Sequence, residues 1–141
     1  MNLTSAFLLA QACLPALRAS GRGSLIHVAS IYGVVGPDLR LYADTEMGQP
    51  AAYAASKGAL VQLTRWLATA LAPHVRVNAI SPGGVLRGQP EPFVRRYVER
   101  TPLQRMACEQ DLLGAVAYLA SDLSAYVTGH NLIVDGGWTA W

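Results

Sequence analysis

Residues 51–84 read "AAYAASKGALVQLTRWLATALAPHVRVNAISPGG", and this stretch decides the fold class because a helical pattern leads directly into a strand pattern. Leucines recur at helical spacing from Leu60 to Leu71, so the spacing predicts a helix from Pro50 to about Ala72, with the proline in its first turn. Residues 75–81, "VRVNAIS", form a short β-branched run that a Pro-Gly-Gly turn ends. This run is typical of a buried strand.

The same alternation of helices and short apolar strands continues on both sides of this stretch. The patterns predict helices at residues 2–19, 91–99 and 109–120, and strands at residues 24–30 and 131–137, the last ending in a turn. Such alternation is typical of an α/β fold whose strands are parallel and joined by right-handed crossovers. The apolar residues within 31–49 recur with no clear periodicity, so we expect a long loop there, and loops of this length are often functional.

Composition indicates one globular domain, since 52% of the 141 residues are hydrophobic and 14% are charged. The net charge is +2 and the charged residues are scattered along the chain, which argues against binding to nucleic acid or to an anionic membrane. No apolar stretch reaches the ~20 residues that span a bilayer. Cys13 and Cys108 have neither metal-ligand nor disulfide spacing, so we expect small core residues in a reducing, cytoplasmic compartment. Trp138 and Trp141 are expected at a surface, and Asn78 in the core.

A tyrosine and a lysine, Tyr53 and Lys57, lie four residues apart and therefore on the same face of the predicted helix. A phenol titrates near ~10 in water, and a nearby ammonium favours its phenolate form. Ser30 ends one predicted strand and Pro82 follows the next, and the carboxyl ends of parallel strands share one edge of a sheet. We therefore expect one cleft in which Ser30 holds a carbonyl or alcohol oxygen and Tyr53 exchanges its proton, while another group carries the hydride.

These motifs together resemble the short-chain dehydrogenase/reductase family. "YAASK" is similar to its Tyr-x-x-x-Lys signature, "VNAISPGGV" to its Asn-x-x-x-Pro-Gly turn, and "VTGHNLIVDGG" to its C-terminal segment. Asn2 in "NLTSAF" resembles the active-site asparagine of the family, and Ser30 in "IHVAS" its catalytic serine. The resemblance implies a doubly wound, Rossmann-type parallel sheet, of which this chain would supply the last three strands.

The resemblance also implies a role for each matching residue. Tyr53 would be the general acid/base and Ser30 would position the substrate oxygen. Lys57 would tune the phenol and hold the nicotinamide ribose, while Asn2 would order a proton-relay water. Besides Tyr53 and Lys57, the residues implied to contact NAD or NADP are Pro82, Gly83 and Val85. The family further implies a small-molecule substrate, no metal, and a homo-oligomer, either dimer or tetramer.

Three departures from the family pattern modify these expectations. No Gly-rich turn precedes Asn2, so we expect residues 1–141 to be one partial domain, the C-terminal half of a protein with a mis-assigned start codon or a truncated gene, and inactive alone. The gap between Ser30 and Tyr53 holds 22 residues, more than in many members. Arg87 replaces the usual threonine and is either a phosphate ligand or a solvated loop residue.

The long gap favours a sugar-like substrate. It carries polar and aromatic residues, namely Tyr32, Asp38, Arg40, Tyr42, Asp44 and Glu46. "SIYGVVGPDLRLY" and the ending "GGWTAW" are similar to the branch of the family that acts in bacterial surface-sugar and flagellin-glycan pathways. Two alternatives to an alcohol/ketone oxidoreductase stay open: a catalytically silent assembly module, and a sugar-nucleotide epimerase or dehydratase that uses the same tyrosine and lysine.

Overall fold

The computed structural model describes residues 2–141 and confirms the α/β fold. The helices and strands, in chain order, are α1 (Asn2–Ala19), β1 (Gly23–Val28), α2 (Ala51–Leu71), β2 (Val75–Pro82), α3 (Glu91–Glu99), α4 (Gln110–Ala120) and β3 (Asn131–Val134). The predicted helices and strands therefore all form, with bounds that shift by a few residues. The predicted loop at residues 31–49 contains two short 3-10 helices, Ile31–Gly33 and Leu39–Tyr42.

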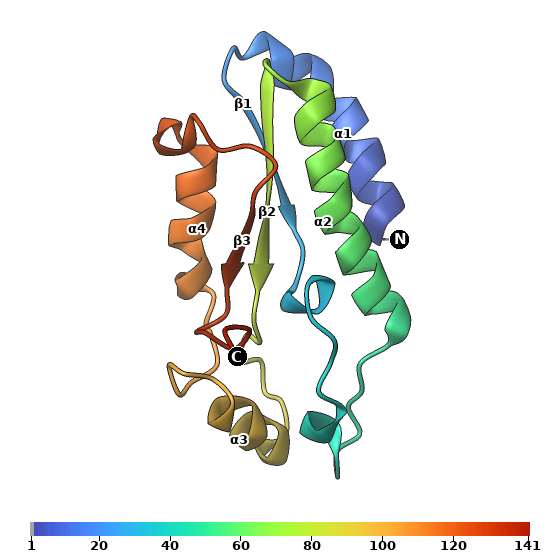
Figure 1. Ribbon diagram of the computed structural model, residues 1–141, viewed down its shortest axis with the longest axis vertical. Coiled ribbons are helices and arrows are strands. Elements are labelled where there is room, and N and C mark those ends of the chain that lie inside the picture. The colour runs from blue at the N-terminus through green and yellow to red at the C-terminus, as the bar shows by residue number, and fades with distance from the viewer. Residues whose placement is uncertain (1) are drawn as a thin grey trace.

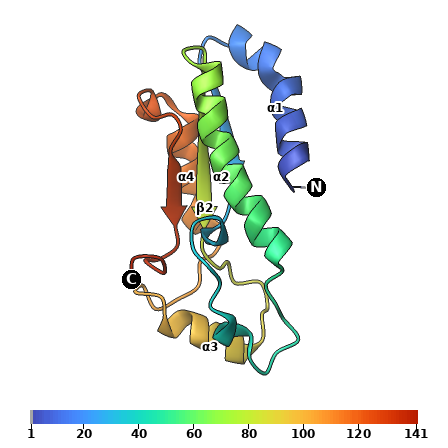
Figure 2. The same ribbon diagram turned by 45° about the vertical axis from the view of Figure 1, so that its right-hand side comes forward.

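The three strands form one parallel sheet in the order β1-β2-β3. Gly23 pairs with Val75 at one end of the first ladder, and Pro82 pairs with Val134 at the carboxyl end of the second. Figure 1 shows α1 and α2 side by side against one face of the sheet and α4 against the other. The arrowheads of the strands all point to one end in Figure 1, and α3 and the loop before α2 lie beyond that end (Figure 2). Within residues 2–141, no strand pairs with the outer edge of β1.

The core beneath α1 and α2 is built from the leucine stripe that the sequence predicts. Leu60, Leu67 and Leu71 are buried, and Leu63 is partly buried against the same clusters. Each such side chain contributes roughly 1.5–3 kcal/mol through removal from water. Asn78 is buried in β2 as expected, because its amide donates to the Val127 carbonyl and accepts from the backbone N–H of His130. The buried leucines hold the long helix α2 on the sheet.

A second cluster lies beyond the carboxyl ends of the strands and is rich in aromatic side chains. Its buried members are Ile31, Leu41, Phe93, Tyr97, Met106 and Trp138. The prediction of a surface position for Trp138 is wrong: the side chain is 1% exposed and its ring stacks on that of Tyr97, with centroids 5.8 Å apart. The chain reverses just before it, at Gly136 and Gly137, whose φ angles are positive, and this turn carries the indole into the cluster.

Both cysteines are exposed, so the prediction that they are core residues is wrong. Cys13 lies beside the face of α1 that packs on the core, and that helix buries only Ala10 completely. Cys108 precedes α4, where its thiol donates to the carboxylate of Asp111 at 3.3 Å. Apolar neighbours along the chain did not indicate burial because they belong to different faces.

None of the helices within residues 2–141 combines the length and the apolarity that crossing a bilayer requires.

Candidate active site

Ser30 lies two residues beyond β1, at the rim of a cleft with a volume of about 240 Å³. Its hydroxyl accepts a hydrogen bond from the backbone N–H of Tyr32 at 3.2 Å and so caps the 3-10 helix Ile31–Gly33. A serine hydroxyl has one proton to donate besides its two lone pairs. Ser30 is thus fixed by the backbone while its own proton can point to an oxygen in the cleft.

Tyr53 lines the same cleft from the first turn of α2. Apart from Lys57, its neighbours along the helix are alanine, serine and glycine, and the residue stays 38% exposed. Lys57 follows one helical turn later, with its Nζ atom 5.6 Å from the centroid of the Tyr53 ring. The prediction that these two groups are neighbours on one helical face is confirmed.

Lys57 is half-buried and its ammonium donates to the carbonyl of Val28, the last residue of β1, at 2.7 Å. Desolvation lowers the pKa of Lys57 from its ordinary value. Lys57 lines a second hollow, of about 290 Å³, together with Asn2. The Asn2 amide donates to the hydroxyl of Ser56 at 3.2 Å, which joins the start of α1 to α2.

The turn after β2 forms the opposite wall of the cleft. Gly83, Gly84 and Val85 all line it, while Pro82 is the last residue of the strand. The backbone N–H of Gly83 donates to the Val134 carbonyl at 2.9 Å. A Cβ atom on Gly83 would lie 2.9 Å from the Cα atom of Asp135, so only glycine allows β2 and β3 to approach so closely. The structure therefore brings Ser30, Tyr53 and this turn together.

Arg87 does not line the cleft that contains Ser30 and Tyr53. Its guanidinium pairs with the carboxylate of Glu109 at 2.7 Å, and both side chains are more than half exposed. An exposed ion pair of this kind contributes at most about 1 kcal/mol. A competing anion can therefore displace Glu109 at little cost.

Charged residues of the loop before α2 pair within the loop or with arginines in and just after α3, and they do not line the cleft. The guanidinium of Arg40 donates two hydrogen bonds to the carboxylate of Asp38 and that of Arg100 donates one, all of 2.8 Å. Hydrogen bonding from Arg40 holds the pKa of Asp38 well below its usual range. Asp44 pairs with Arg96 of α3 at 3.3 Å. The expectation that the polar residues of this loop gather beside the carbonyl site thus fails for Asp38, Arg40 and Asp44.

Uncharged residues of the same loop do reach the cleft. The hydroxyls of Tyr32 and Tyr42 are 2.9 Å apart, and the Tyr42 hydroxyl lies 3.5 Å from the Oε1 atom of Gln49. Burial raises the pKa of Tyr32 and of Tyr42, so both phenols are neutral at physiological pH. Among the described residues that line this cleft, none carries a charged side chain.

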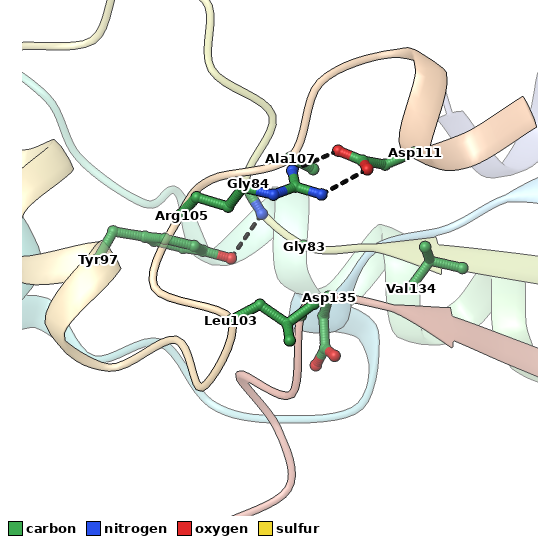
Figure 3. A pocket seen from close by; sticks show the side chains of 10 residues that line it. Gly83, Gly84, Tyr97, Leu103, Arg105, Ala107, Asp111, Val134 and Asp135 are labelled. Carbon is green, nitrogen blue, oxygen red and sulfur yellow. Dashed lines mark hydrogen bonds and ion pairs between the residues drawn. The ribbon is translucent and has the colours of Figure 1, made fainter.

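The wall formed by α3 could not be anticipated from the sequence. Phe93 and Tyr97 of α3 line the cleft together with Met106, which follows that helix. The Tyr97 hydroxyl accepts a hydrogen bond from the backbone N–H of Gly84 (Figure 3). In the sequence, Phe93 and Tyr97 read only as an apolar pair one helical turn apart. The Gly83-Gly84 pair was the available signal, since adjacent glycines mark a close approach by another part of the chain.

Comparison with known proteins gives matches along nearly the whole chain. The family model described as enoyl-(acyl carrier protein) reductase matches residues 1–139. Sorbose reductase of Schizosaccharomyces pombe is 38% identical over 98% of this chain and 52% of its own length. Post-translational flagellin modification protein A of Campylobacter coli is 32% identical over 98% of this chain and 54% of its own length. The chain spans about half the length of the curated relatives it matches.

Among solved structures, a short chain dehydrogenase of Leptospira borgpetersenii with bound NAD+ superimposes with a TM-score of 0.90. The two sequences are 42% identical, and the match covers 98% of this chain and 53% of the other. Other matched structures contain NADP or NADH. From the match over residues 1–139 and this structural likeness, the chain belongs to the short-chain dehydrogenase/reductase family.

Proposed function

We propose that the protein is an NAD- or NADP-dependent oxidoreductase that interconverts an alcohol and a ketone. The observation that carries this proposal is the cleft in which the Ser30 hydroxyl and the Tyr53 phenol face the same space, with the Lys57 ammonium 5.6 Å from the phenol ring. Membership of the family supports it. Oxidation of NADH or NADPH by the full-length protein in the presence of hydroxylated ketones tests the proposal, and absence of turnover with both cofactors would count against it.

The donors present at the carboxyl ends of β1 and β2 suit the nicotinamide end of the cofactor. An ammonium, a phenol and a side-chain amide can donate to ribose hydroxyls, and Gly83 and Val85 line the same cleft as the phenol. We assign ribose contacts to Tyr53 and Lys57 and nicotinamide contacts to the backbone of Pro82, Gly83 and Val85. The bound cofactor supplies or accepts the hydride.

The residues of the chain handle the proton and the substrate oxygen. In the reducing direction the Ser30 hydroxyl donates a hydrogen bond to the substrate carbonyl and the Tyr53 phenol transfers its proton to that oxygen. The ammonium of Lys57 favours the phenolate that results. Asn2 is assigned the water through which the proton is replaced. In the oxidising direction the phenolate takes the proton of the alcohol.

Arg87 is the proposed contact for a phosphate of the cofactor or of the substrate. Its exposed ion pair with Glu109 would have to break, and this costs little because such a pair contributes little free energy. A guanidinium can bind phosphate oxygens with two parallel hydrogen bonds.

A sugar-like substrate is the finer part of the proposal. The cleft offers hydroxyl and amide groups from Tyr32, Tyr42 and Gln49, and its described lining carries no charge. Neutral donors and acceptors of this kind suit additional hydroxyl groups on a substrate. The likeness to sorbose reductase and to the flagellin modification protein supports the same substrate class.

Tyr42→Phe is expected to raise the KM of a polyhydroxylated ketone about three- to tenfold, because one neutral hydrogen bond is lost. The KM for NADH or NADPH should stay within error, since Tyr42 lies on the substrate side of the cleft. Steady-state kinetics on the full-length protein measure both values. Tyr126→Phe is the matched control because that side chain is fully exposed. Equal shifts in both KM values would mean that the loop supports the fold instead.

The full-length protein is expected to be a homo-oligomer, a dimer or a tetramer. Leu8 and Leu9 of α1 and Trp66 of α2 are more than half exposed on the two adjacent helices, which leaves apolar surface for a second copy. Light scattering at micromolar concentration should give a multiple of the monomer mass. Trp66→Glu should lower that mass, and a monomer mass for the unsubstituted protein would refute the expectation.

We further propose that residues 1–141 act as one part of a Rossmann-type domain in a cytoplasmic protein with a small-molecule substrate, without a role in binding nucleic acid or membrane.

A further inference from the structure

Tyr97 connects α3 to the turn after β2 through one short hydrogen bond. Its hydroxyl oxygen lies 2.5 Å from the backbone nitrogen of Gly84, and the N–H donates to it. Figure 3 shows the phenol reaching from α3 to that nitrogen. A backbone N–H in a loop has no strand or helix partner of its own, so this phenol supplies the partner that the turn requires.

The ring of Tyr97 also sets the path of the turn by contact. A Cβ atom on Gly84 would lie 2.8 Å from the Cζ atom of Tyr97, and one on Gly83 would lie 2.9 Å from its hydroxyl oxygen. The two glycines therefore pack directly against the ring and its hydroxyl. The turn also lines the cleft with Ser30 and Tyr53, and Tyr97 lines that cleft beside it.

The position of Tyr97 itself is fixed by its surroundings. The residue is 2% exposed, and its ring stacks on Trp138 and contacts Phe93, with centroids 5.8 and 5.9 Å away. Burial raises the pKa of Tyr97 to about 12, so the phenol stays neutral at physiological pH. Tyr97 and the two glycines also line a small cavity of about 140 Å³, which the bidentate ion pair between Arg105 and Asp111 borders.

We propose that Tyr97 is a positioning residue that holds the Gly83-Gly84 turn in the conformation that binds the nicotinamide end of the cofactor. This inference rests on the proposed function, because it assigns the turn to the cofactor. Tyr97 lines the cleft, but its hydroxyl is engaged with the backbone of Gly84, so we assign it neither the hydride nor the proton that is transferred. Its hydroxyl should therefore matter for cofactor affinity more than for the chemical step.

Tyr97→Phe in the full-length protein tests the inference, since it keeps the ring and removes only the hydroxyl. We expect the Kd for NADH or NADPH, measured by fluorescence titration, to rise about three- to tenfold. The amide of Gly84 should exchange its hydrogen faster in the absence of cofactor, which is a readout independent of activity. The KM of the ketone should change less than the Kd of the cofactor.

Thr101→Val is the matched control. Thr101 is buried and its hydroxyl donates to the carbonyl of Tyr97 at 2.7 Å, so the substitution also removes one buried hydrogen bond at the end of α3. It should lower the unfolding temperature comparably but leave the Kd of the cofactor and the exchange of the Gly84 amide unchanged. A positioning role predicts this contrast, whereas a purely structural role predicts equal effects.

An unchanged Kd in Tyr97→Phe, or an equal rise in Thr101→Val, would overturn the inference. Binding of NADH or NADPH without turnover of any ketone would overturn the proposed function. The Kd and the exchange of the Gly84 amide would then still decide the role of Tyr97. A full-length protein that binds neither dinucleotide overturns both.

Discussion

Tyr53→Phe in the full-length protein is expected to lower kcat about 10²–10⁴-fold, the usual contribution of a positioned general acid or base. The phenol oxygen is the only group of this side chain that can carry a proton, and phenylalanine retains the ring. The residue is 38% exposed and is a member of none of the core clusters, so folding should be preserved. The affinity for NADH or NADPH should remain near normal.

Steady-state turnover and a separate fluorescence titration of the cofactor distinguish loss of chemistry from loss of binding. Tyr118→Phe is a suitable control, because this partly exposed tyrosine lies on α4, which packs against the other face of the sheet. Retention of most activity by Tyr53→Phe would remove Tyr53 from the proton transfer and with it the assignment of this cleft.

Lys57→Ala is expected to reduce both kcat and cofactor affinity, and so to lower kcat/KM for the cofactor more than Tyr53→Phe does. The substitution removes the charge beside the phenol, the proposed ribose contact and the hydrogen bond to the Val28 carbonyl. Lys57 is also the one lysine of the sequence, and every other basic residue except the three histidines is arginine. A compact ammonium at this position thus has no substitute nearby.

Lys57→Arg gives a matched comparison, because the charge remains but the planar guanidinium has a different reach and hydrogen-bond geometry. It should recover part of the affinity for the cofactor and less of kcat. Arg65→Ala on the same helix should change neither value, since that side chain is exposed and bonds only to Gln62. A cofactor Kd that Lys57→Ala leaves unchanged would contradict the ribose contact, even if turnover falls.

The fold was predictable because local signals and tertiary packing agree. The leucines of α2 repeat at helical spacing and are the side chains that pack on the sheet, and Pro82 with two glycines ends β2 where the structure ends it. Burial was harder to predict from local signals. Trp138 is buried because the turn at Gly136 and Gly137 carries it back under α3, and only the folded chain shows this reversal.

The site was predictable only in part, for a similar reason. Helical geometry predicts that Tyr53 and Lys57 are neighbours. The rule that the carboxyl ends of parallel strands meet at one edge of a sheet predicts that Ser30 lies in the same cleft. Tyr97 reaches Gly84 from 13 residues away through tertiary contact, which no local pattern encodes. In the loop before α2, composition indicated polar groups but could not show that Asp38 faces arginines while Tyr42 faces the cleft.

The proposed reaction is direct hydride exchange between a nicotinamide cofactor and a ketone bound beside Ser30 and Tyr53. Its most direct test uses NADH or NADPH carrying deuterium on the transferable position of nicotinamide C4, with the full-length protein and hydroxylated ketones. We predict one deuterium on the carbinol carbon of the product for each cofactor oxidised, and loss of this transfer in Tyr53→Phe. A product formed without net cofactor oxidation would indicate an epimerase or dehydratase. Cofactor binding without any product would indicate a silent assembly module, and either result would contradict the account.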